Sequence, residues 1–69
     1  MADMILKLTE HAKIKMAQLC ITKEQIKLVI QRGGKFHQAG GYLASYGNIK
    51  VAYKPIGKNA YKIKTVFLD

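Results

Sequence analysis

Two histidines and a nearby lysine are the residues of this sequence whose chemistry suits RNA cleavage without a metal ion. Such cleavage needs a base, an acid and cations beside the charge that develops on the phosphate. His11 and His37 are the only histidines, and imidazole is the side chain that ordinarily titrates near neutral pH. Lys15 lies one helical turn after His11 and would face the same phosphate. These three residues are the candidate catalytic set, although His11 could equally be a surface or capping residue and His37 a structural one.

The sequence lacks the residue groupings that other reaction chemistries need. The four acids are Asp3, Glu10, Glu24 and Asp69, and no two of them are grouped as a catalytic carboxylate pair. One cysteine and two histidines are fewer than the four ligands of a structural zinc site. The sequence therefore predicts no metal and no cofactor.

The balance of charge is the strongest compositional signal. The 69 residues carry 12 Lys and Arg against 4 acids, a formal net charge of +8. Within residues 11–68 there are 11 basic residues and one acid, which gives 11 − 1 = +10. Lysines and arginines bind phosphates with release of counterions, so the composition predicts a nucleic acid, RNA or DNA, as the partner. A basic surface kept only for solubility is the other interpretation.

The first half of the chain has helical periodicity. Thr9 is the expected N-cap of a first helix, whose apolar positions repeat at i, i+4, i+7 and i+8: Ala12, Met16, Leu19 and Cys20. Thr22 and Gln25 form a capping box that opens a second helix, with an apolar stripe of Ile26, Val29 and Ile30. The pair Gly33-Gly34 is expected to end this helix in the left-handed conformation.

After Gly34 the period becomes two, which predicts strands at residues 35–39, 42–46, 49–54 and 61–68. The expected connections are turns at Gly40-Gly41 and Gly47-Asn48 and a loop at residues 55–59. Alternation places one set of side chains on a shared buried face: Ile49, Val51, Tyr53, Tyr61, Ile63, Thr65 and Phe67.

These elements predict an α+β fold in which two N-terminal helices pack on one face of a three- or four-stranded antiparallel sheet, as a single domain over residues 1–69. The predicted core contains Met16, Ile26, Ile30, Val51, Tyr53 and Ile63. The opposite face and its surroundings are the predicted nucleic-acid surface: Arg32, Lys50, Lys54, Lys62, Lys64, Tyr42 and Tyr46. The alternative is that these lysines are only the outward half of amphipathic strands.

Nothing in the sequence predicts export or membrane insertion. Residues 1–8 lack a basic n-region, and their apolar run is too short for a signal peptide. No stretch approaches the length of a transmembrane helix, and a lone cysteine cannot form an internal disulfide. We therefore expect a cytoplasmic protein with no membrane partner.

The segment His11-Ala12-Lys13-Ile14-Lys15-Met16, followed by Ile21-Thr22, resembles a family of small uncharacterised domains whose first helix reads H-A-x-x-R-M. The later Gly40-Gly41-Tyr42, residues 49–53 and Thr65-Val66 also fit that family. It is placed among the RelE-like and barnase-like ribonucleases and toxins. The resemblance implies helices followed by a four-stranded antiparallel sheet, and a metal-independent endoribonuclease.

Three positions depart from the family pattern. Lys15 stands where the family has an arginine, and Leu19-Cys20 stands where it has an arginine-glycine pair. Lysine keeps the charge but loses the bidentate fork that holds a phosphate. Three functions stay open at this point: a ribonuclease toxin or its degenerate relative, a nucleic-acid binder that does not cut, and an interaction module with an acidic, antitoxin-like partner.

Overall fold

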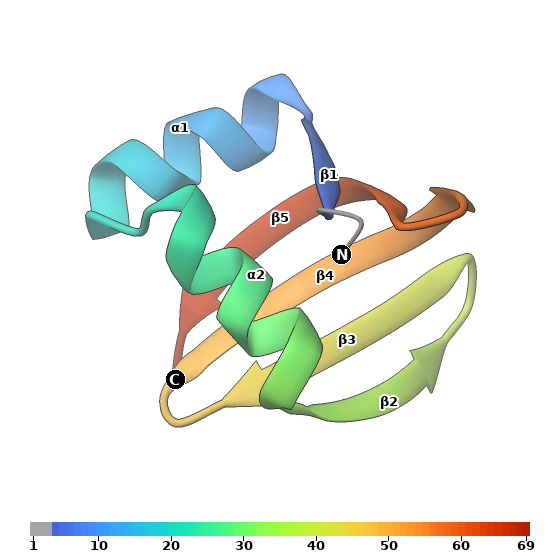
Figure 1. Cartoon of the computed structure of the whole chain (residues 1–69). Helices are drawn as coiled ribbons and strands as arrows, with labels where there is room; N and C mark the ends of the chain where they lie inside the picture. Colours follow the sequence, from blue (N-terminus) through green and yellow to red (C-terminus); the bar gives the residue numbers. More distant parts are fainter. Residues whose placement is uncertain (1–3) are drawn as a thin grey trace.

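A computed structural model describes residues 4–69, which form a five-stranded mixed sheet with both helices on one of its faces (Figure 1). The elements in chain order are β1 (Ile5–Leu8), α1 (Glu10–Leu19), α2 (Lys23–Arg32), β2 (Gly34–Gln38), β3 (Gly41–Tyr46), β4 (Ile49–Gly57) and β5 (Ala60–Leu68). The strands lie in the order β1-β5-β4-β3-β2. β1 is parallel to β5, and all other neighbours are antiparallel.

The α+β class is confirmed, but the prediction of a three- or four-stranded antiparallel sheet is wrong. It omits β1, whose four residues are too few for a pattern of alternation to stand out. The partner of β1 lies at the other end of the chain, since Leu6 is aligned with Tyr61 of β5. Thr9 continues this attachment, because its hydroxyl oxygen lies 3.0 Å from the carbonyl oxygens of both Ile63 and Lys64.

Both helix starts follow the local sequence. The Thr9 hydroxyl accepts from the Ala12 N–H at 3.1 Å, and Thr22 and Gln25 make the two reciprocal hydrogen bonds of a capping box. The predicted left-handed stop at Gly33-Gly34 is wrong, because Gly33 is extended with φ −76°. Glycine is needed there for space: a Cβ would lie 2.5 Å from the carbonyl oxygens of Ser45 and Val29.

The hairpin turns are close to their predicted positions. The β2–β3 turn is Ala39-Gly40, one residue earlier than predicted, and Gly40 has φ 79°. The Gly47-Asn48 turn is confirmed. β4 and β5 continue through most of the predicted loop and meet at a turn of residues 58–59.

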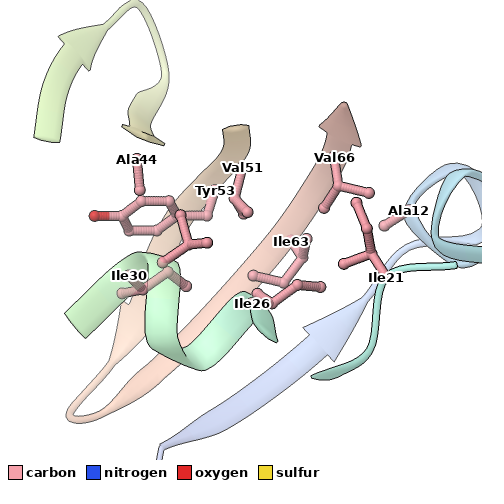
Figure 2. Packing of buried hydrophobic residues seen from close by; sticks show 10 residues of the cluster. Ala12, Ile21, Ile26, Ile30, Ala44, Val51, Tyr53, Ile63 and Val66 are labelled. Carbon is pink, nitrogen blue, oxygen red and sulfur yellow. The ribbon is translucent and has the colours of Figure 1, made fainter. Parts of the chain in front are cut away.

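The core lies between the helices and one face of the sheet, where Figure 2 shows Ile26 of α2 close to Ile63 of β5. Five of the six predicted core residues are buried, and Met16 is half-buried against them. The remaining buried residues are Ala12, Ile21, Val29, Ala44 and Val66. In the part of the chain that the structure describes, neither helix is long and apolar enough to cross a membrane.

A bulge in β5 overturns part of the predicted face. The register of β4 and β5 shifts between Ala52 and Tyr53, because Ala52 is aligned with Thr65 but Tyr53 with Ile63. Lys64 is the extra residue, and the alternation of side chains changes by one position beyond it. Val66 therefore faces the helices. Thr65 and Phe67, which the alternation predicts on the face of Ile63, face away from them.

Candidate nucleic-acid interface

Three exposed lysines form a row across the face of the sheet that carries no helix, here called the open face. Lys7 of β1 is aligned with Lys62 of β5, and Lys62 is aligned with Lys54 of β4. Neighbouring strands are about 4.8 Å apart, so the Cα atoms of the three lysines in this lysine row lie within roughly 10 Å. Like charges directly opposite one another are destabilising unless an anion lies between them. An anion lying between these ammonium groups would remove the repulsion.

An apolar row lies next to the lysine row on the same face. Its cross-strand members are Phe36, Leu43 and Ala52, from β2 to β4, and the polar Thr65 continues it on β5. Phe36 is 57% exposed, and Phe67 is half-buried one row further along β5. Two residues along a strand span about 6.7 Å, so a ligand of nucleotide size can reach both rows.

The site predicted from the sequence omits three residues of the open face: Lys7, Phe36 and Phe67. The sequence does contain a signal for Phe36. Side chains alternate along β2, so Phe36 lies on the opposite face of the strand from Lys35 and His37. No local signal could have identified Phe67, because only the bulge at Lys64 turns it to the open face.

Two of the predicted lysines are held by contacts within the chain. The Lys50 ammonium lies 2.9 Å from the carboxylate of Asp69, which offsets its charge. The Lys64 ammonium donates to the Gly40 carbonyl oxygen at 2.7 Å. Gly40 lies in the β2–β3 turn and Lys64 on β5, so this side chain extends across β4. Lys54 and Lys62 are thus the predicted lysines that stand in the lysine row.

The predicted tyrosines lie on the other side of the sheet. Tyr42 stacks on Tyr53 with ring centroids 5.8 Å apart, and Tyr53 is a core residue. Tyr46 has the same parity in β3 as the buried Ala44, so it also faces the helix side, where it is 41% exposed. Arg32 is exposed at the end of α2, in the helix layer. Neither tyrosine nor Arg32 joins the lysine row.

The candidate catalytic residues are not brought together. His11 is exposed in the first turn of α1, and Lys15 is half-buried one turn later. His37 lies on β2, where its ring meets the edge of Tyr42 at a centroid distance of 4.8 Å. α1 packs on β5, and β5 is three strand spacings, about 14 Å, from β2. The two histidines therefore cannot serve one phosphate as a base and acid pair.

Within residues 4–69, no three side chains of His, Cys, Asp or Glu are grouped so that they could hold a metal ion. No protein-family model, curated protein or solved structure matches the chain. The resemblance to RelE-like and barnase-like ribonucleases therefore stays a prediction from the quoted residues.

Proposed function

We propose that the protein binds single-stranded RNA on the open face of its sheet. The observation that carries this proposal is the lysine row, Lys7-Lys62-Lys54, beside an apolar row that begins at the exposed Phe36. A strand of RNA lying across the β-strands would place phosphates on the lysines and bases on the apolar row. Proteins that bind single strands commonly combine a basic track for the backbone with aromatic rings for the bases.

Simple solvation of the lysines explains this arrangement less well. Lysines that serve only solubility gain nothing from standing directly opposite one another, and each such pair lowers stability by roughly several tenths of a kcal/mol. An RNA backbone removes that repulsion and releases its own counterions. RNA is proposed ahead of DNA because the resemblance described above implies an RNA ligand.

The separation of His11 from His37 is why we propose binding and not cleavage. A base and an acid must each come within hydrogen-bond reach of the atoms they serve, about 3 Å. Of the three predicted catalytic residues, His11 and Lys15 share one element, and that element is on the helix side of the molecule. The lysine row lies on the opposite side of the sheet.

The test is a salt titration of binding to a labelled single-stranded RNA, followed by fluorescence anisotropy. Replacing Lys54 and Lys62 together by Gln should flatten the slope of log affinity against log salt by about 1.4, since each phosphate contact on a single strand contributes about 0.7. The matched control replaces Lys13 and Lys23, two exposed lysines of the helices, by Gln. Equal losses in the two variants would show that only net charge matters and would contradict the proposal.

A further inference from the structure

β2 forms an open edge of the sheet. Its five residues, Gly34–Gln38, are all exposed, and among the described strands it pairs with β3 alone. The helices pack mainly on β3, β4 and β5, so β2 extends beyond the helix layer (Figure 1). This edge lies at the end of the sheet opposite β1, away from the lysine row.

The backbone of β2 has hydrogen-bonding groups that point outward. The two-residue turn Ala39-Gly40 makes Gln38 and Gly41 the hydrogen-bonded pair that closes the hairpin. Hydrogen-bonded and non-hydrogen-bonded pairs alternate along an antiparallel ladder. The pairs of Lys35 with Ala44 and of His37 with Tyr42 are therefore of the second kind. The N–H and C=O groups of Lys35 and His37 face away from β3.

Few of the usual features that protect an edge strand are present here. β2 contains no proline, and its register with β3 is continuous from Gly34 to Gln38, without a bulge. Lys35 is the one lysine on this strand, and Phe36 is 57% exposed beside it. Natural proteins usually cover, shorten or interrupt such an edge, because it can pair with another extended chain.

We propose that β2 receives an extended acidic segment of another protein, which pairs antiparallel with it as a sixth strand. Charge complementarity selects this occupant, because the chain carries +8 and the exposed Arg32 and Lys35 flank the start of β2. A second copy of the chain would bring the same positive charge to the same edge. The favoured segment has acidic residues opposite Lys35 and His37 and an apolar residue opposite Phe36, on the other face.

The probe is a seven-residue peptide of alternating glutamate and valine, titrated into the full chain while amide NMR shifts and hydrogen exchange are recorded. Binding should slow exchange at the Lys35 and His37 amides and leave the lysine row unaffected. The control peptide has the same sequence with N-methyl groups on the residues that pair with β2. Loss of two backbone hydrogen bonds should weaken its binding about tenfold or more.

Two variants separate the backbone pairing from the charge. His37→Pro removes an outward-facing donor without removing a hydrogen bond to β3, so it should weaken peptide binding while circular dichroism shows the fold intact. Lys35→Glu should weaken the glutamate peptide and allow a lysine–valine peptide to bind. Lys58→Glu, in the exposed β4–β5 turn, makes the same change of charge and is the control.

Three results would overturn this proposal: equal affinity for the N-methylated peptide, protection located away from β2, or a concentration-dependent dimer that His37→Pro abolishes. The last would identify a second copy as the occupant. The RNA titration is a separate assay that reports on the lysine row, which the peptide does not contact, so failure of RNA binding leaves the peptide result interpretable, although both surfaces include Phe36. Retained RNA binding in His37→Pro would show that the two surfaces are independent.

Discussion

The two faces of the sheet come from the same strands but have opposite properties. In β4, Val51 and Tyr53 face the helices and are 0% and 3% exposed, whereas Lys50 and Lys54 face the other way. Among the described residues, no polar or charged side chain is buried. The helix-covered face therefore supplies the stability, and the open face carries charge that opposes it. Removing a buried side chain from the covered face should lower stability, whereas removing a lysine charge from the open face should raise it.

The largest expected effect is on the covered face. Ile63 is 0% exposed, so Ile63→Ala should lower the free energy of unfolding by about 2–5 kcal/mol, the usual penalty for a large-to-small core change. Thr65→Ala, two positions along the same strand but on the open face, should cost no more than about 0.5 kcal/mol. Urea melts compare the two, and equal losses would break the distinction between the faces.

A smaller effect is expected where the helix layer joins the sheet. Thr9 caps α1 and its hydroxyl also lies beside two carbonyl oxygens of β5, so Thr9→Ala should cost about 0.5–2 kcal/mol. Thr22 caps α2 and takes part in its capping box. Thr22→Ala is therefore the control for the cap alone. A smaller loss at Thr9 than at Thr22 in the same melts would show that the bonds to β5 contribute nothing.

The open face should respond with the opposite sign. Lys62→Gln removes the central charge of the lysine row and should raise stability by about 0.2–1 kcal/mol in the absence of RNA. The gain should shrink near 1 M salt, where the screening length is about 3 Å. Lys58→Gln, in the exposed β4–β5 turn, measures the effect of net charge alone. A loss of stability in Lys62→Gln at low salt would contradict the repulsion described here.

The smallest effect is expected at alkaline pH and again belongs to the covered face. Burial, followed by the neighbouring Tyr61 and Tyr42, raises the pKa of Tyr53 above its ordinary value of 10.0. The folded state then holds the phenolic proton more tightly than the unfolded state. The stability that this difference in proton binding contributes is complete below the pKa of Tyr53 in the unfolded chain. It is lost as the pH rises through the pKa of Tyr53 in the folded chain.

Comparing melts near about pH 8 and about pH 11 in the parent and in Tyr53→Phe tests this prediction. The parent should lose more stability than Tyr53→Phe over that interval. The variant also controls for the lysines, which lose charge over the same range in both proteins. An identical pH dependence of stability in the two proteins would show that the pKa of Tyr53 is the same in the folded and unfolded chains.

Features set by neighbouring residues could be predicted from the sequence. The caps at Thr9 and Thr22 and the Gly47-Asn48 turn depend on residues a few positions apart, and all three are present. β1 could not be predicted in this way, because its partner β5 is remote in the chain. The bulge at Lys64 could not be predicted either, because it depends on the fit between β4 and β5.

The same distinction applies to the candidate site. Alternation places Lys54 and Lys62 correctly, because no bulge separates them from the buried Tyr53 and Ile63. Lys7 was not predicted as a site residue, because its strand β1 was not predicted. It becomes part of the lysine row only through the parallel pairing of β1 with β5. Strand faces were thus predictable where no bulge intervenes, whereas the rows that cross the strands required the strand order.

The pairing of β1 with β5 also has a consequence for how the chain folds. β2, β3, β4 and β5 are joined by short turns, so their hairpins can form from local contacts. β1 instead needs contacts such as that of Leu6 with Tyr61, and the Thr9 cap of α1 contacts Ile63, which is 54 positions away. Closing that long loop is the slow kind of step in folding. During synthesis, β1 and α1 must therefore wait for β5 to leave the ribosome before they can dock.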